Sequence, residues 1–200
     1  IYDQAVVAVA QLQLDPGEVA QPFLSPPTVA WLVTPLVPVP YSPSYYLWAA
    51  LTLGAYIAAL AWATSSRGLE RWILVMAAVA PWWVLESVRV GQVVPLVAAG
   101  MAISWRLLRE NRDVAAGLAL SLLLLKPNTA FLVPFAVLAA PRVRAFAALT
   151  AVGGLLAVAA LLTVGADGAF DYWSQLTGSL PTGAHALTLE RALGFRGPAI

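Results

Sequence analysis

The sequence predicts an all-α fold, a polytopic bundle of transmembrane helices, and three features lead to this prediction. Of the 200 residues, 60% are hydrophobic and only 10% are charged, and the mean hydropathy is +0.79. No charged residue occurs between Glu18 and Arg67. A soluble domain carries about 25% charged residues. Lipid accepts such an apolar chain, provided that the backbone satisfies its own hydrogen bonds in helices.

Composition also excludes several classes of function. The net charge is only +1, whereas a nucleic-acid surface needs clustered Lys and Arg on one face, so we expect no nucleic-acid partner. The chain has no cysteine, which excludes disulfides, Fe–S clusters and thiolate zinc sites.

The sequence predicts part of a single transmembrane domain, in three segments. Residues 1–26 are predicted to form an extracytoplasmic loop, residues 27–164 the membrane helices, and residues 165–200 a second, Gly-rich extracytoplasmic loop. Ile1 is not an initiator methionine, and the chain stops in the polar stretch GFRGPAI. We therefore expect a fragment that is truncated at both ends.

Apolar runs predict the helices. The first and last are long enough to span a bilayer, and the runs on either side of Lys126 hold twelve residues each. Twelve helical residues reach about 18 Å, against a hydrocarbon thickness of about 30 Å. Such short helices persist where they line a wet cavity, so the pair predicts one. The prolines of residues 26–40 favour a broken or re-entrant segment. The runs are residues 45–63, 72–85, 90–105, 114–125, 129–140 and 145–164.

Basic residues in the loops predict the orientation. Three loops, SSRGLER, RLLRENRD and PRVR, hold seven of the eleven basic residues, so we place these loops in the cytoplasm. The loops between them, ESVRVGQ and KPN, then face outward together with the stretch after Val164.

Lys126 is the sharpest candidate for chemistry. It follows four leucines and precedes a proline, at the outer junction of the two short helices. A cation beside a free helix terminus there would suit a phosphate. The alternative is a lysine whose ammonium group reaches out to the membrane interface.

Several other polar residues have both a functional and a structural interpretation. Gly91 and Gln92 open a predicted helix, where the glycine permits a close approach and the glutamine binds a sugar hydroxyl or caps the helix. Glu86 and Arg89 stand three residues apart and favour a structural ion pair. Asp3 in the first outer loop is a general base or a solvated carboxylate.

The remaining candidates are weaker. His185 is the only histidine and is typical of a surface residue rather than a metal ligand. The chain has no HExxH, Walker or GxSxG motif. The run TAVGGLLAV favours helix packing through small residues.

The order of these features resembles glycosyltransferase family 87, the polyprenyl-phosphate-sugar-dependent transferases that include mycobacterial mannosyltransferases. The likeness rests on SPPTVAWLVTPLVPVP, the Leu47-Trp48 pair, an apolar run with Pro81 that leads to GQ, the block AAGLALSLLLLKPNTAFLVP and a later DYW. It covers nearly all of the chain. Val94 departs from the asparagine that the family often has two places after the glutamine.

The resemblance implies a GT-C-type membrane enzyme whose short or re-entrant helices line an extracytoplasmic cavity. The donor would be a polyprenyl-phosphate sugar, usually mannose, acting as a co-substrate, and no further cofactor and no metal site are expected. The acceptor would be a lipid or glycan of a bacterial cell envelope. The enzyme would lie in the cell membrane, plasma or inner, as a multi-pass protein among membrane lipids.

Site residues follow from the same resemblance. The family's GQ matches Gly91 and Gln92, and its Lys-Pro matches Lys126 and Pro127. Asn128 and Tyr2 join them as substrate-binding candidates. The family's catalytic carboxylate lies beside the tyrosine that Tyr2 matches, so it is Asp3 or a residue upstream of Ile1.

Two other functions fit the residues. A transporter or lipid-linked sugar flippase would also use short helices and a buried cation, and should show an internal repeat of topology. A non-catalytic membrane scaffold should lack polar residues at membrane depth, where Gln92 and Lys126 are predicted to lie.

Overall fold

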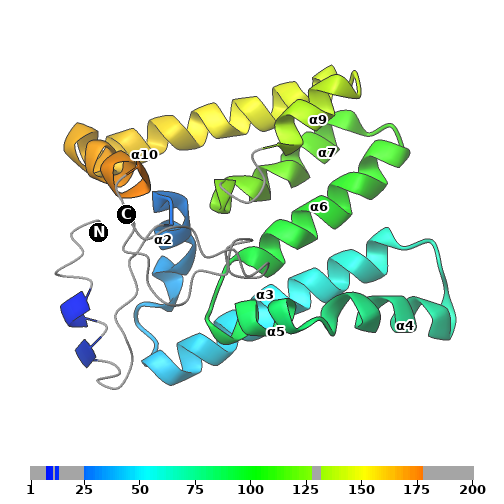
Figure 1. The fold of residues 1–200 in the computed structure, drawn as a ribbon, viewed down its shortest axis with the longest axis horizontal. Helices are drawn as coiled ribbons and strands as arrows, with labels where there is room; N and C mark the ends of the chain where they lie inside the picture. The colour runs from blue at the N-terminus through cyan, green and yellow to red at the C-terminus, as the bar shows by residue number, and fades with distance from the viewer. Residues whose placement is uncertain (1–7, 11, 14–24, 128–131, 178–200) are drawn as a thin grey trace, which may run out of the picture. The chain divides into compact units, whose positions relative to one another are not determined.

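The computed structural model describes residues 8–10, 12–13, 25–127 and 132–177, and every regular element among them is a helix. The chain divides into two compact units. Ser25–Gly165 form the larger one, which holds almost all of the described helices (Figure 1). In the smaller one, which joins the two ends of the chain, the described residues are 8–10, 12–13 and 166–177.

Among the residues that the structure describes, two helices are long and apolar enough to cross a membrane. Helix α3 covers Tyr41–Ala63, and the second candidate span, Val143–Ser174, lies within helix α10, Val143–Thr177. Both match predicted spans. Helix α10 also corrects the prediction of a loop after residue 164, because residues 166–177 are helical beyond a break at Gly165, where φ is +77°. Asp167 lies just after this break, where a helix N-terminus favours negative charge.

The predicted run 72–85 is a bent pair of helices rather than one straight segment. Helix α4, Gly68–Val79, and helix α5, Trp82–Arg89, meet at an angle of 67°. Pro81 lies at the break and has no backbone N–H with which to continue the hydrogen bonds of α4. If the pair counts as one broken span, three segments could cross the membrane.

The other helices are short, as predicted for the Lys126 region. Helix α6 covers Val94–Arg109. Helix α7, Asp113–Leu120, continues as the 3₁₀ helix η2, Ser121–Leu125, and helix α9 covers Val133–Ala139. The Pro-rich segment forms α2, Pro27–Val33, and the 3₁₀ turn η1, Thr34–Leu36. These ten residues reach about 15 Å as a helix, so they cannot cross a hydrocarbon layer of about 30 Å once.

Two glycines bring the helices of the larger unit together. A Cβ atom on Gly100 of α6 would lie 2.7 Å from the carbonyl oxygen of Ala119. A Cβ atom on Gly117 of α7 would overlap the carbonyl oxygen of Ala145 and lie 2.8 Å from the Cβ of Ala148 in α10. Helix α6 therefore approaches α7 closely at Gly100, and α7 approaches α10 closely at Gly117. In the run TAVGGLLAV, Gly153 packs against Leu124, and Gly154 faces open space.

Large apolar side chains remain exposed over much of this unit. Trp83 is 73% exposed, Leu155 is 70% exposed and Leu162 is 81% exposed. A soluble monomer rarely exposes contiguous apolar surface on this scale. The surface of the helices therefore suits lipid or further helices.

The helices of the larger unit run between two chemically different ends. Tyr45 and Trp48, early in α3, bond to the turn that precedes α6. At the other end of α3, the carbonyl oxygen of Trp62 accepts a hydrogen bond from Arg106, late in α6. Arg142 bonds to Asp113 at the start of α7, at 3.0 Å. The three arginine-bearing loops thus meet at one end, and the GQ turn lies at the other (Figure 1).

Candidate functional site

Gly91 ends helix α5, and this corrects the prediction that it opens a helix. The N–H of Gln92 donates to the carbonyl oxygen of Ser87 at 2.8 Å, and that of Gly91 donates to Val88 at 3.0 Å. This pair of bonds is the Schellman motif, which needs a left-handed residue after the helix. Gly91 supplies it with φ of +67°. Nothing lies within 4 Å of its missing Cβ, so the glycine serves the turn and not the close approach of another helix.

Gln92 and Lys126, 34 residues apart in the chain, lie in direct contact. The Lys126 Nζ donates a hydrogen bond of 2.7 Å to the Gln92 Oε1. The structure thus joins the GQ block to the LKP block. Capping by Gln92 is not what is found, because the residue that precedes α6 is Val93 and no side chain caps that helix.

The turn that carries Gln92 is held from helix α3. Trp48 Nε1 donates to the carbonyl oxygen of Gly91 at 2.9 Å, and the Tyr45 hydroxyl donates to that of Arg89 at 2.8 Å. Trp48 also packs against the main hydrophobic cluster, which includes Val93 and Leu125. Two aromatic side chains therefore fix the backbone on both sides of Val90, and with it the start of the GQ turn.

Sequence reasoning missed this role of Tyr45 and Trp48. The two residues are three apart, so they lie on one face of a helix. Their spacing at the start of an apolar run could have indicated a shared face, but it does not predict which turn their side chains contact.

Lys126 combines partial burial with a neutral partner. It directly follows η2, its own N–H bonds to the carbonyl oxygen of Leu123 at 3.0 Å, and it lies outside both helices long enough to span a membrane. Burial lowers the pKa of Lys126 from its usual value. The ammonium is thus partly stripped of water, which strengthens its interaction with any anion that it meets.

The predicted Glu86–Arg89 pair is confirmed. Arg89 donates from Nε and Nη2 to the two carboxylate oxygens of Glu86, at 2.8 and 2.7 Å. Arg89 is also the last residue of α5, where a cation favours the helix dipole. The pair therefore has a structural role at the helix end.

Four sequence candidates fall outside the described residues: Tyr2, Asp3, Asn128 and His185. Their roles stay predictions. Among the residues that are described, no three His, Asp or Glu side chains gather in a way that could hold a metal ion.

Comparison with known families decides the class of protein. The family model of glycosyltransferase family 87 matches residues 23–193, which include the GQ turn, Lys126 and every helix from α2 onward. The chain belongs to glycosyltransferase family 87. It matches no curated protein and no solved structure.

Membership of family 87 makes the chain part of a membrane glycosyltransferase, with a sugar donor and an acceptor as its partners. The family assignment selects the transferase over the flippase and the scaffold. The apolar helices fit the membrane location. Within the family 87 chain, Gln92 and Lys126 are the site candidates that the structure brings together.

Proposed function

We propose that this family 87 enzyme transfers mannose from a polyprenyl-phosphate donor to a lipid or glycan acceptor on the extracytoplasmic face of the cell membrane. The observation that carries the proposal is the 2.7 Å bond between Lys126 and Gln92. It places one partly buried cation in a defined position beside a polar amide. A phosphate that leaves with its charge needs such a partner.

The chemistry is an inverting displacement. The acceptor hydroxyl attacks the anomeric carbon in line with the bond to the phosphate oxygen, and that bond breaks as the new glycosidic bond forms. The lipid phosphate leaves with the bonding electrons. A carboxylate, for which Asp3 is our candidate, takes the proton of the hydroxyl. Lys126 interacts with the leaving phosphate, and Gln92 acts as a positioning residue.

The neutral amide suits this role better than a carboxylate would. A carboxylate beside Lys126 would cancel the charge that attracts the phosphate. The Gln92 Oε1 instead accepts one hydrogen bond and adds no negative charge. It also favours the protonated form of lysine, against the effect of burial.

The distribution of arginines supports the extracytoplasmic side. The three loops that hold seven arginines meet at one end of the larger unit, and basic loops favour the cytoplasm. The Gln92–Lys126 contact lies at the opposite end of α6 from Arg106 and Arg109. An outward site therefore agrees with inward arginines.

Replacement of Lys126 tests the proposal. In the full-length enzyme, Lys126→Ala should lower transfer of lipid-linked mannose by about 100-fold or more, because one preorganised electrostatic partner of the developing charge is lost. Membrane vesicles with labelled donor supply the measurement, with the amount of folded enzyme matched. Arg144→Ala, which removes an exposed cation at the other end, is the control and should keep full activity. Equal activity of Lys126→Ala and the control would refute the phosphate role.

A further inference from the structure

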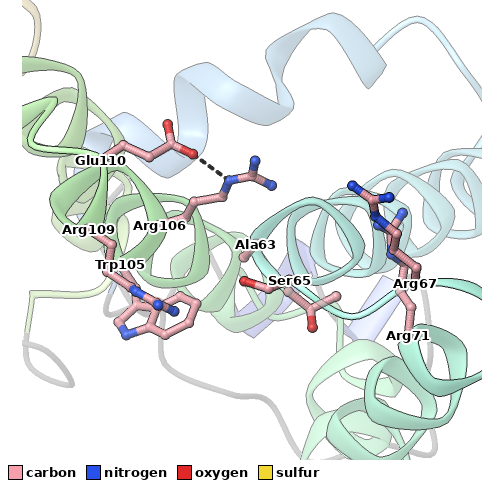
Figure 2. A pocket seen from close by; sticks show the side chains of 9 residues that line it. Ala63, Ser65, Arg67, Arg71, Trp105, Arg106, Arg109 and Glu110 are labelled. Atoms are coloured by element: carbon pink, nitrogen blue, oxygen red, sulfur yellow. Dashed lines mark hydrogen bonds and ion pairs between the residues drawn. The ribbon is translucent and has the colours of Figure 1, made fainter.

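A second polar site lies at the arginine-bearing end of the larger unit. A cavity of about 420 Å³ opens between the loop after α3, the start of α4 and the last turn of α6. Figure 2 shows Arg106 reaching into it from α6, while Arg67 and Arg71 reach in from the opposite side. Trp105 and Arg109 lie next to Arg106 along α6.

The lining of this cavity is strongly positive. Arg67, Arg71, Arg106 and Arg109 line it, and Glu110 is the one carboxylate among the lining residues. The surplus is three positive charges. Within the described residues, Arg67 and Arg109 make no ion pair, so their charges are not neutralised by carboxylates that the structure describes.

Two of the guanidinium groups are held in place. Arg71 Nε donates to the carbonyl oxygen of Ser66 at 2.9 Å. Arg106 donates from Nε to Glu110 at 2.7 Å and from Nη1 to the carbonyl oxygen of Trp62. These bonds lower the entropy that a bound anion would otherwise have to remove from long side chains.

The aromatic rings beside the cavity are typical of a membrane interface. Arg106 lies over the ring of Trp62, 4.4 Å from its centroid, and Arg109 lies over that of Trp105 at 4.8 Å. Both tryptophans are exposed, Trp62 by 40% and Trp105 by 51%. Tryptophan is enriched where lipid headgroups meet the hydrocarbon. Beyond Arg71, helix α4 continues with exposed Trp72 and Ile73.

We propose that this cavity binds the phosphate headgroup of an anionic phospholipid from the leaflet in which the arginine-bearing end lies. Arginine binds phosphate with paired donors, and basic pockets between membrane helices are suited to anionic headgroups. The exposed apolar side chains beside the cavity would receive the acyl chains, which a free phosphate lacks.

This site is distinct from the proposed transfer site. The sixteen residues of α6 separate Arg109 from the turn that carries Gln92, and a helix of that length is about 24 Å long. A lipid at the arginine-bearing end therefore cannot touch Lys126 with its headgroup. Its expected effect is to anchor and orient this end of the enzyme.

Native mass spectrometry of the full-length enzyme tests the proposal. The enzyme is offered equal amounts of dioleoylphosphatidylglycerol and dioleoylphosphatidylcholine, and the ratio of the bound lipids is measured. Arg67→Gln with Arg109→Gln should lower the preference for the anionic lipid about tenfold or more. Arg112→Gln with Arg144→Gln removes the same charge from a neighbouring cavity at the same end and should change it by less than about twofold.

Three results would overturn the inference. An equal loss in both double variants would mean diffuse attraction to the surface, and no loss in either would mean that the cavity binds no headgroup. Displacement of the bound lipid by millimolar inorganic phosphate would mean a site for the free anion. If the double variant does not fold, as judged by its thermal transition, Arg67→Gln alone should still lower the preference about threefold, and an unchanged preference contradicts the inference.

Discussion

The two ends of the larger unit handle positive charge in opposite ways. At one end Lys126 is partly buried and bonds to the neutral amide of Gln92. At the other end arginines from three loops face a carboxylate, backbone carbonyls and aromatic rings. Arginine keeps its charge in any environment, whereas the charge of lysine responds to burial. The first arrangement suits a step that depends on one positioned charge, and the second suits attraction and anchoring.

Helix α7 with η2 runs between the two ends and packs closely against α10 at Gly117, so a substitution at Gly117 tests this packing. A methyl group at Gly117 would collide with Ala145 and Ala148 of α10, so Gly117→Ala should lower the free energy of unfolding by about 1–3 kcal/mol. Gly154→Ala makes the same chemical change where nothing lies within 4 Å, and it should be neutral or stabilising by up to about 1 kcal/mol. Thermal unfolding in detergent compares the two variants. Equal transitions would mean that α7 and α10 do not pack closely at Gly117.

Removal of the Gln92 amide tests whether Gln92 positions Lys126. Gln92→Leu should lower transfer about tenfold, because it leaves the ammonium without the hydrogen-bond acceptor that positions it. Burial already lowers the pKa of Lys126, and loss of the acceptor should lower this pKa further. Raising the pH should then remove the charge earlier, so the alkaline fall in activity should begin at lower pH in the variant.

The pH profile separates this role from a general loss of structure. An alkaline limb at the same pH in Gln92→Leu and in the unmodified enzyme would contradict the coupling of Gln92 to Lys126. Lys126→Arg offers a second check, since a guanidinium stays charged and any activity that remains should lose the alkaline limb.

The smallest expected effect tests the arginine-bearing end. Arg142 and Asp113 form a partly exposed pair at 3.0 Å, with 33% and 20% of their side chains exposed. Asp113→Asn should therefore cost about 0.5–1 kcal/mol of stability. Glu86→Gln weakens a pair whose arginine is 68% exposed and should lower the thermal transition by less than Asp113→Asn does. A larger shift for Glu86→Gln than for Asp113→Asn would contradict this ranking of the two pairs.

Periodicity and length predicted the helices well where the signal was strong. The runs that became α3 and α10 were predicted because each holds more than eighteen residues without a charge and with a high mean hydropathy. Two boundaries were wrong for local reasons. Pro81 divides one apolar run into α4 and α5, and the segment after Gly165 continues as helix. Mean hydropathy alone does not predict either boundary, because it contains no information on missing N–H groups or on favourable charge at a helix start.

Only part of the candidate site could be predicted from the sequence. Gly91, Gln92 and Lys126 were singled out as polar or permissive positions between apolar runs and then matched to the motifs of family 87, but the contact of Gln92 with Lys126 could not be deduced from their spacing. Tyr45 and Trp48 were missed, because a side chain that holds a distant backbone carbonyl leaves no pattern in its own neighbourhood. The arginines served only to orient the loops, and their shared cavity was not foreseen.

By itself, the sequence determined that this protein belongs in lipid, which stretches are helical, and which loops carry positive charge, because these properties depend on composition and short-range order. Only the tertiary structure decided that Gln92 bonds to Lys126 and that four arginines surround one cavity. The first depends on the close packing of α6 against α7 and η2 at Gly100, and the second depends on the packing of α3 against α4 and α6, so contacts between distant residues decide both.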